Sequence, residues 1–435
     1  MNFITGLDRR PLAEIRSAQS ELLREQVRYA FARSPFYRER LAGVDADSLS
    51  MDDLSGLPLT SKEDIQRKNS AFLCVEDKDV AEVVATTGTT GEHVYVYLTK
   101  NDLVRLAENE KRCFSYAGIG ADDLVLLSVT LDNLFIAGLA YYTGLVRLGA
   151  GVIRLGPHSP KKHLEIIETL RPTGIVAVPS FMSAIYKQAD KDNISLERSS
   201  LEKAVLIGET IRNPDFSSNA LGLMVERCKR LETYSTYGIT EIAAAFSECA
   251  EHKGLHSHPD LVYPEVVDES GSPVKDHETG ELVVTTFQVE GMPLLRYRTG
   301  DITFRISEPC ACGRNSIRIG PITGRKAHRL KVKGTTVYPR SIENALVGVE
   351  GVENYVIEAY TGDDYADRIV VRVGSNNTGS SFKLDISEAI RAKARVAPQV
   401  EIMPPQEVEK ILYEGSRRKP MVFIDRRQKV HDVKL

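Results

Sequence analysis

The sequence predicts an α/β fold whose larger, amino-terminal part is built on a parallel sheet covered by helices. Predominantly apolar runs recur along this part, and stretches with helical spacing separate them. The apolar runs lie at 124–129, 151–155, 174–178 and 204–207, and clear helical stretches lie at 161–170 and 180–191. Strands that are apolar throughout are buried on both faces, which is typical of parallel sheets with helices on either side.

The regions that flank this repeating pattern give different signals. Residues 10–45 have the spacing of surface helices, and Ser61 is the expected cap of a helix that follows a turn. Between 261 and 306 the pattern alternates, so 262–267 and 280–286 are expected to form antiparallel strands of a small β subdomain.

The last quarter of the chain has the pattern of a compact α+β domain. The expected elements are a strand at 329–333, a helix at 339–348, strands near 353–359 and 368–373, and a helix at 382–394. A Gly-Arg pair at 324–325 precedes this pattern. We therefore predict a large domain at 1–324 and a small domain at 325–435.

The bulk properties exclude several classes of protein. A chain of 435 residues is too long for one compact domain, and its 42% apolar and 27% charged residues are typical of a globular protein. The net charge of −4 provides no basic field, which excludes nucleic acid as the main partner. No apolar run reaches the ~18–20 residues that span a bilayer. The first ten residues lack the apolar core of a secretory signal, so a cytoplasmic location is expected.

Three short motifs lie far apart along the chain. They are the loop Thr86-Thr87-Gly88-Thr89-Thr90-Gly91, the segment Tyr234-Ser235-Thr236-Tyr237-Gly238-Ile239-Thr240-Glu241, and the segment Arg298-Thr299-Gly300-Asp301. Glycines permit tight turns that point backbone amides at anionic oxygens, and hydroxyls add donors, so the first motif suits phosphate binding. A carboxylate such as Glu241 is a suitable ligand for a metal that bridges phosphates. The alternatives are a hairpin turn for the first motif and an ordinary first helical turn for the second.

In this order, and with Gly324-Arg325 after them, the motifs resemble those of the adenylate-forming enzymes, which include acyl-CoA synthetases, carrier-protein adenylation domains and luciferases. Residues 295–301 resemble the phenylacetate-CoA ligase branch in particular. The resemblance implies a large amino-terminal adenylate-forming domain and a small, mobile α+β carboxyl-terminal domain.

The resemblance also implies a role for each motif residue. Thr86 to Gly91 would cradle the triphosphate, Gly208 and Glu209 would form the adenine-side loop, Tyr237 and Gly238 would pack against adenine, Thr240 would contact the α-phosphate, Glu241 would bind Mg²⁺, and Asp301 and Arg325 would bind the ribose hydroxyls. One ionised carboxylate has enough lone pairs to accept hydrogen bonds from both ribose hydroxyls, which suits Asp301.

Two lysine-bearing segments near the carboxyl terminus complete the resemblance. Lys333 and Gly334 lie in a segment similar to the loop that moves in for thioester formation. Lys419 is expected to be the adenylation lysine, because an ammonium can neutralise charge between the substrate carboxylate and the α-phosphate. A solvated basic tail is the alternative for residues 417–427.

The chain departs from the family pattern at several positions. Thr87 replaces a serine, Glu92 and His93 stand where a basic residue and a proline are usual, and Ala327 replaces a charged hinge residue. Glu92 removes a positive charge near the triphosphate. Residues 131–138, which would line the acid pocket, also differ from the aromatic- and glycine-rich form of the branch. The resemblance therefore does not predict which carboxylic acid is the substrate.

Four residues predict a metal site. Cys249, His256, Cys310 and Cys312 offer three thiolates and one imidazole, which suit a closed, structural zinc site. Paired cysteines in a cytosolic chain favour a metal over a disulfide, and phenylacetate-CoA ligase-like proteins often carry the same set. His252 and His258 are the reserve ligands, and isolated thiols with surface histidines are the alternative.

The implied function is ATP-dependent activation of a carboxylic acid, by default aromatic or arylacetic, to an acyl-adenylate, followed by transfer to the thiol of CoA. The implied cofactors are ATP, with AMP as a product, Mg²⁺, CoA and a structural Zn²⁺. A carrier protein and a homodimer are open as partners, and no membrane partner is expected. An alternative keeps adenylation but uses a carrier-protein thiol, an amine or no acceptor. A third possibility is a nucleotide- or acid-binding homologue that has lost catalysis.

Overall fold

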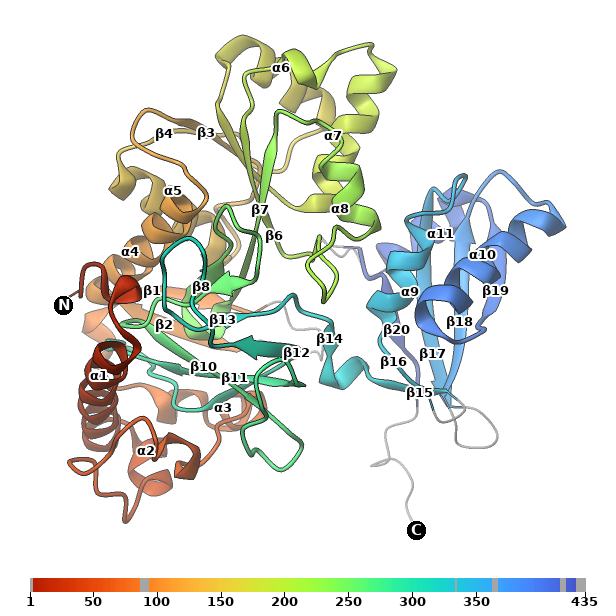
Figure 1. Cartoon of the computed structure of the whole chain (residues 1–435). Coiled ribbons are helices and arrows are strands. Elements are labelled where there is room, and N and C mark those ends of the chain that lie inside the picture. The colour runs from red at the N-terminus through yellow and green to blue at the C-terminus, as the bar shows by residue number, and fades with distance from the viewer. Residues whose placement is uncertain (1–2, 87–93, 333–334, 362–366, 415–419, 428–435) are drawn as a thin grey trace. The chain divides into compact units, whose positions relative to one another are not determined.

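The protein is described from a computed structural model, which describes residues 3–86, 94–332, 335–361, 367–414 and 420–427. The chain forms two compact units. The large unit comprises Met1–Ser217 and Gly222–Ile322, and the small unit comprises Ser218–Leu221 and Thr323–Leu435 (Figure 1).

The centre of the large unit is a parallel sheet. Its strands, in spatial order, are β4 (Gly151–Arg154), β3 (Leu124–Leu127), β5 (Gly174–Ala177), β6 (Lys203–Ile207) and β7 (Glu232–Ile239). All four neighbouring pairs are parallel. The predicted parallel sheet is therefore confirmed.

Helices cover both faces of this sheet. Alternate residues of β3 point to opposite faces: Val125 and Leu127 join a core with residues of α4 (Lys100–Tyr116) and α5 (Ile136–Leu148). Leu126 joins a second core with residues of α6 (Pro160–Leu170) and α7 (Pro179–Lys191). Because both faces are buried, the strands need apolar residues at every position, which explains the continuous apolar runs. The short helix α8 (Ala220–Val225) precedes β7 in the chain.

Beyond β7 the same sheet continues with antiparallel strands. In spatial order they are β8 (Ala244–Ser247), β9 (Leu255–His256), β13 (Arg318–Ile319), β12 (Tyr297–Ile306), β11 (Thr279–Thr286) and β10 (Val262–Val267). The expected antiparallel strands at 262–267 and 280–286 are present as β10 and β11, which pair with each other. The strands β9 and β13, of two residues each, connect this region to the parallel sheet, and strands so short leave no pattern in the sequence.

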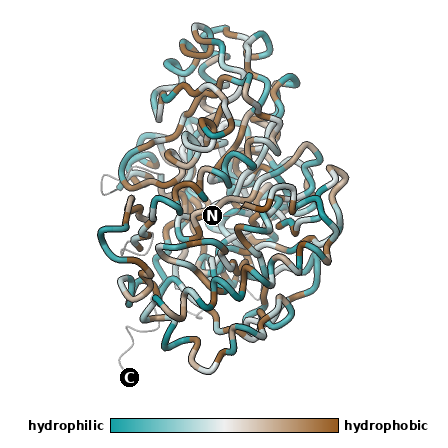
Figure 2. Tube along the Cα trace, turned by 90° about the vertical axis from the view of Figure 1, so that its left-hand side faces the viewer, coloured by the Kyte–Doolittle hydropathy of each residue, from teal (hydrophilic) through white to brown (hydrophobic). Residues whose placement is uncertain are grey.

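The amino-terminal segment of the large unit forms helices and one strand pair. Its elements are α1 (Leu12–Arg33), α2 (Pro35–Arg40), α3 (Lys62–Lys68), β1 (Val80–Ala85) and β2 (Tyr95–Thr99), and β1 pairs antiparallel with β2. Ser61 caps α3 as expected, in a capping box with Asp64. Figure 2 shows how apolar and polar residues alternate along the chain.

The small unit has the expected α+β pattern. Its four-stranded sheet has the order β19 (Gln399–Met403), β18 (Asp367–Gly374), β17 (Asn354–Thr361) and β20 (Phe423–Asp425), and its helices are α9 (Pro339–Leu346), α10 (Ser380–Ala394) and α11 (Pro405–Leu412). Residues of α9 and α10 bury the core of the unit against β17 and β18. The remaining strands are β14 (Gly324–Arg325), β15 (Leu330–Val332) and β16 (Thr335–Val337), and β15 pairs antiparallel with β16.

Candidate functional site

The second motif lies at the last strand of the parallel part of the sheet, where the pairing between strands changes from parallel to antiparallel. Residues up to Ile239 belong to β7, and Thr240 and Glu241 form a short 3-10 turn immediately after it. A side chain at Gly238 would place its Cβ 3.0 Å from the carbonyl oxygen of Ala244 on β8, so only glycine fits without a shift. Thr240 and Glu241 therefore follow the carboxyl end of a parallel strand, the position at which open α/β sheets bind ligands.

The second and third motifs meet through a side-chain hydrogen bond. The hydroxyl of Tyr237 donates to Oδ2 of Asp301 at 2.8 Å, and Asp301 is buried on β12. Gly300 has a φ of +75°, a left-handed conformation that glycine adopts at low cost. On the same strand, Arg298 donates from Nε and Nη2 to Glu281 of β11 at 2.9 and 2.6 Å, which fixes the strand that carries Asp301.

Glu241 has two close neighbours. The hydroxyl of Tyr297 donates to its Oε1 at 3.2 Å, and the ammonium of Lys62 lies 3.5 Å from the same oxygen. Burial, and then the carboxylate of Glu241, raise the pKa of Tyr297, so this phenol stays protonated and acts as a donor. Sequence reasoning missed Lys62. The cap at Ser61 marks a helix start, but nothing in the local pattern indicates that the next residue reaches Glu241.

Of the predicted phosphate loop, the structure describes only the first residue, Thr86. Thr86 follows β1, and its backbone amide donates to the carbonyl of Val94 at 3.0 Å. Its hydroxyl accepts a hydrogen bond from the amide of Val94 at 3.2 Å. These bonds close the base of the loop, while Thr87, Gly88, Thr89, Thr90 and Gly91 lie outside the described residues.

The predicted adenine-side loop follows β6. Gly208 has a φ of +76°, and a side chain added there would meet no atom within 4 Å. Glu209 accepts a hydrogen bond at 2.7 Å from the amide of Ser180, in the first turn of α7. Glu209 therefore caps α7, an observation that gives this residue a structural role in the large unit.

The remaining predicted nucleotide residues belong to the small unit. Arg325 lies in β14 and is exposed. Lys333, Gly334 and Lys419 lie outside the described residues, so their roles stay predictions.

The structure brings together the four predicted metal ligands. The ligand atoms of Cys249, His256, Cys310 and Cys312 all lie within 4.8 Å of one another. Sγ of Cys249 is 3.8 Å from Sγ of Cys310, and Sγ of Cys312 is 3.6 Å from Nε2 of His256. The cluster forms because β9, which carries His256, pairs with both β8 and β13, and the cysteines lie in the loops beside these strands.

The chemistry of this Cys/His cluster fits a divalent metal. Burial, and then the nearby Arg314, lower the pKa of His256 to about 3, so its imidazole is neutral. Its Nδ1 lies 3.2 Å from Oγ of Ser316, which leaves Nε2 toward the thiols. Burial raises the pKa of Cys249 to about 12, and the thiol would therefore need a metal to ionise. For Cys312, burial opposes ionisation, but hydrogen bonds led by that from Arg314 lower its pKa.

The two reserve ligands do not join the cluster. His252 contacts Glu248, with 3.3 Å between Nδ1 and the carboxylate. His258 is fully buried between Tyr116 and Cys113, with its ring nitrogens 3.2 and 3.3 Å from the hydroxyl and the thiol. Both imidazoles therefore have other partners.

Models of known protein families match most of the chain. A model of the AMP-binding enzyme family matches residues 8–291, and a model of the C-terminal domain of AMP-binding enzymes matches residues 334–427. The chain belongs to the AMP-binding enzymes. The prediction of an adenylate-forming enzyme is thereby confirmed.

Similar proteins place this AMP-binding enzyme near one group of ligases. It is 34% identical to the phenylacetate-coenzyme A ligase of Thermus thermophilus over 398 residues, which cover 89% of this chain and 85% of the relative. It is 29% identical to the phenylacetate-coenzyme A ligase of Aromatoleum evansii, over 96% of this chain and 95% of the relative. The structure of a 2-hydroxyisobutyryl-CoA ligase with a bound adenylate, 21% identical, has a TM-score of 0.82 and covers 96% of this chain and 91% of that protein. This last match supports the fold.

The amino-terminal segment of this AMP-binding enzyme is joined to the Cys/His cluster. Arg314 donates to Sγ of Cys312 at 3.3 Å and to the carboxylate of Asp8 at 2.9 Å. Its guanidinium stacks on the ring of Tyr116, whose hydroxyl donates to the same carboxylate at 2.7 Å. Arg9 donates to the carbonyl of Cys312. The loop that carries Cys312 is therefore held by residues that lie just before α1.

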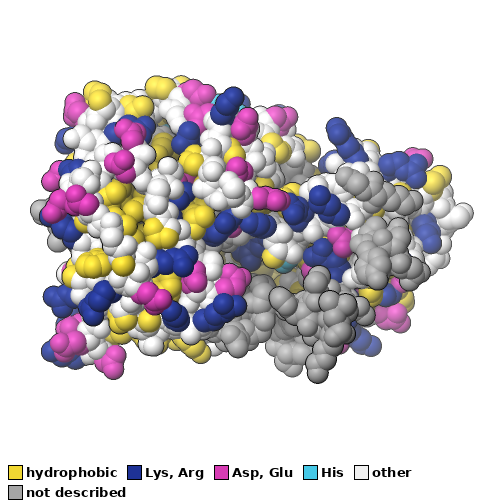
Figure 3. All heavy atoms as spheres, turned by 90° about the horizontal axis from the view of Figure 1, so that it is seen from below, with side chains coloured by type: hydrophobic (Ala, Val, Ile, Leu, Met, Phe, Trp, Pro, Cys, Tyr) yellow, Lys and Arg dark blue, Asp and Glu magenta, His cyan; other side chains and the backbone are white. Residues whose placement is uncertain are grey.

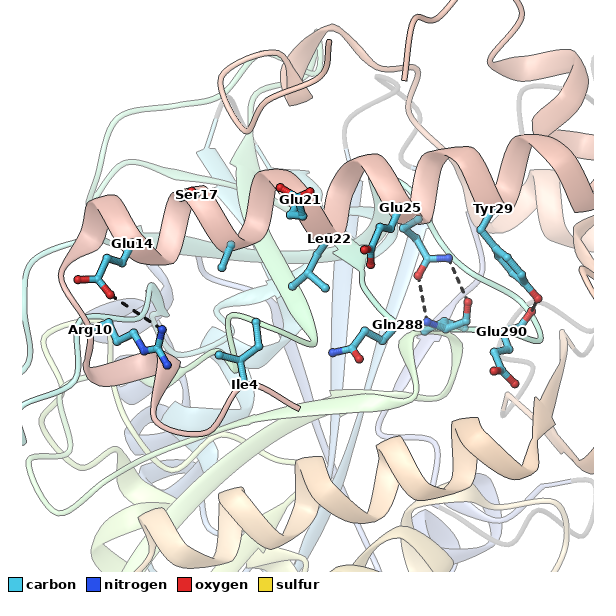
Figure 4. Close-up of a pocket in the computed structure, with 13 residues that line it drawn as sticks. Ile4, Arg10, Glu14, Ser17, Glu21, Leu22, Glu25, Tyr29, Gln288 and Glu290 are labelled. Carbon is cyan, nitrogen blue, oxygen red and sulfur yellow. Dashed lines mark hydrogen bonds and ion pairs between the residues drawn. The ribbon is translucent and has the colours of Figure 1, made fainter. Parts of the chain in front are cut away.

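A groove elsewhere on the large unit carries none of the predicted site residues. It runs beside α1 and is lined by apolar side chains such as Ile4 and Leu22 and by the carboxylates of Glu14, Glu25 and Glu290 (Figure 4). On the face shown in Figure 3, acidic and basic side chains are interspersed, in keeping with the low net charge. Within the described ranges, no helix is both long enough and apolar enough to cross a membrane.

Proposed function

We propose that this AMP-binding enzyme is an AMP-forming acid–CoA ligase of the phenylacetate-CoA ligase type. It would join a carboxylic acid to ATP to give an acyl-adenylate and pyrophosphate. The thiol of CoA would then displace AMP to give a thioester. Dividing the reaction in this way replaces a poor leaving oxygen with AMP, a good leaving group. Support comes from the two phenylacetate-coenzyme A ligases that are similar to the chain over most of their length.

The observation that carries the proposal is the convergence of the second and third motifs. Tyr237, on β7, contacts Asp301, and Glu241 follows immediately after the end of β7. In our proposal Asp301 accepts hydrogen bonds from the ribose, Tyr237 packs against adenine, and Thr240 contacts the α-phosphate. Glu241 would hold Mg²⁺, which neutralises phosphate charge when bound. The enzyme contributes mainly positioning and charge neutralisation.

The small unit would supply the remaining groups. We assign Arg325 to the ribose, Lys419 to the adenylation step, and Lys333 with Gly334 to the thioester step. These assignments require a small domain at 325–435 that moves between the two half-reactions, as the family resemblance implies. The match of a separate family model to residues 334–427 supports a distinct small domain.

The acid is proposed to be aromatic or arylacetic, on the names of the relatives. Residues that would line its pocket include the turn that precedes α5, where Asn133 and Leu134 both have positive φ values. Gly138 approaches this turn so closely that a side chain there would clash with the carbonyl of Thr130. In our proposal, this strained turn and the glycine contact fix the path of the pocket wall.

We also propose one structural zinc ion, held by Cys249, His256, Cys310 and Cys312. Four protein ligands leave no position for water, so the metal would take no part in the reaction. Its role would be to hold together the loops on either side of β9 and β13.

Product analysis over a panel of acids tests the proposed reaction. The purified enzyme is incubated with ATP, Mg²⁺ and CoA and with phenylacetate, benzoates and short aliphatic acids, and the products are identified by mass spectrometry. We expect AMP and one acyl-CoA in equal amounts. Acyl-adenylate without thioester would favour a different acceptor, such as a carrier-protein thiol or an amine. Retained ATP binding without any adenylate would favour a binding protein.

A further inference from the structure

Lys62, the first residue of α3, is held in a fixed position beside the candidate active site. The preceding residue, Ser61, accepts a hydrogen bond from the amide of Asp64 at 3.2 Å, and the carboxylate of Asp64 accepts from the amide of Ser61 at 2.9 Å. One residue earlier, buried Thr60 exchanges backbone hydrogen bonds with Arg296 and Arg298, at 3.0 and 2.8 Å. The start of α3 is therefore attached to the segment that leads to Asp301.

The ammonium of Lys62 faces the carboxylate of Glu241. Nζ lies 3.5 Å from Oε1, and the side chain of Lys62 is 29% exposed while that of Glu241 is 8% exposed. The buried carboxylate thus has its cation on the solvent side. Tyr297 donates to the same oxygen and is neutral, so it adds no charge.

The predicted phosphate loop supplies no cation for an anionic ligand. The loop at 86–93 contains no lysine or arginine and includes one carboxylate, Glu92. ATP brings several negative charges, and an unneutralised triphosphate beside Glu241 would be repelled. A lysine has a compact charge on a flexible stem, so it can exchange one oxygen partner for another without a change in the backbone.

We propose that Lys62 binds the phosphate oxygens of ATP. This inference rests on the proposed function, in which Glu241 binds magnesium. Before nucleotide binds, Lys62 compensates the charge of Glu241. With a magnesium ion held by Glu241, the ammonium of Lys62 would be free to bind the phosphates. The amino-terminal helical segment then contributes a direct ligand to the nucleotide site.

Equilibrium binding without an acid substrate tests this role. Titration calorimetry in the presence of Mg²⁺ compares adenosine with a non-hydrolysable ATP analogue on the wild type, Lys62→Met and Lys62→Arg. We expect Lys62→Met to weaken the analogue about tenfold and to leave adenosine unchanged, because a charge-assisted hydrogen bond to phosphate is lost. Lys62→Arg, which keeps the charge, should restore part of the affinity.

Lys68→Met is the matched control. Lys68 lies on the same helix and pairs with Glu39 at 3.2 Å, but both partners are exposed. This variant should bind the analogue like the wild type. Unchanged affinity of Lys62→Met for the analogue, or an equal loss for adenosine, would overturn the inference. A wild-type protein that binds neither ligand would instead overturn the proposed function itself.

Discussion

The hydroxyl of Tyr237 donates a 2.8 Å hydrogen bond to Asp301, although the two residues lie in different motifs and on strands that are not neighbours in the sheet. Tyr237 is on β7, at the end of the parallel part, and Asp301 is on β12, in the antiparallel part. The bond joins the proposed adenine contact to the proposed ribose contact. Removing either partner should therefore weaken nucleotide binding and change the stability of the fold little.

Tyr237→Phe keeps the ring and removes this donor. We expect it to weaken ATP binding by about 1.5 kcal/mol, or about tenfold, because Asp301 loses a partner that orients it. Asp301→Ala should nearly abolish adenylation. Titration calorimetry gives the affinity, and thermal unfolding should show little change. Tyr360→Phe is the matched control, since Tyr360 donates a similar bond, of 3.0 Å, to Glu358. Wild-type ATP affinity in Asp301→Ala would refute the ribose assignment.

Glu241→Gln removes a charge at almost constant shape. The amide oxygen can still accept from Tyr297, so the fold should survive. Adenylation should be nearly abolished, because an amide is a much weaker magnesium ligand than a carboxylate. The measurement is the rate of adenylate formation as a function of Mg²⁺ concentration, with circular dichroism as the check on folding. A variant with wild-type magnesium dependence would show that Glu241 is not the metal ligand.

Lys419→Ala tests the division of labour between the half-reactions. We expect it to stop formation of the adenylate and still convert supplied acyl-adenylate and CoA to thioester, because the lysine would neutralise charge only in the first step. Rapid-quench measurements follow each half-reaction separately. Equal losses in both would be incompatible with this assignment.

The zinc proposal predicts one metal ion per chain. Cys312→Ser should lose the metal and lower the melting temperature, since the thiolates can no longer hold the loops beside β9 and β13. Any loss of activity should follow unfolding. Elemental analysis of the native protein and calorimetry of the variant provide the two readouts, and Cys228→Ser, at a buried cysteine outside the cluster, is the control. Well under one zinc per fully active chain would contradict the proposal.

Glu110 on α4 predicts a pH dependence of stability. Its side chain is buried against Gly144, and burial raises its pKa from 4.5 to about 8. Below the lower value, both the folded and unfolded states hold the proton. As the pH rises from 4.5 to 8, only the unfolded chain loses it, so the free energy of unfolding falls.

Glu110→Gln removes this penalty. We expect the variant to be more stable than the wild type at pH 8, and the difference to shrink as the pH approaches 4. Chemical denaturation across this range measures it. The control is Glu168→Gln, at an exposed position of α6. A stability difference that is independent of pH would mean that Glu110 is ionised in the folded protein.

Sequence reasoning predicted the features that depend on local pattern. The parallel strands were visible because burial on both faces requires apolar residues at every position. The capping box at Ser61 was visible because it needs two residue types at a fixed spacing. The four residues of the Cys/His cluster were singled out by residue type, even though the two halves of the set are far apart in the sequence.

Other features depend on contacts that no local pattern records. The strands β9 and β13 have two residues each, and they exist because neighbouring strands hold them. Lys62 reaches Glu241 because Thr60 is bonded to residues on either side of Tyr297, a pairing between distant parts of the chain. Glu209 and Ser61 both cap a helix, but only Ser61 adjoins its helix in the sequence, so only its cap could be predicted.

The most direct test of the central claim is acid-dependent exchange between ATP and labelled pyrophosphate. The purified wild type, Asp301→Ala and Lys68→Met are measured over a panel of carboxylic acids in the absence of CoA. Our account predicts exchange with at least one aromatic or arylacetic acid in the wild type and in Lys68→Met, and almost none in Asp301→Ala. Exchange that is absent from the wild type for every acid, while ATP still binds, would contradict the claim that this chain activates carboxylic acids.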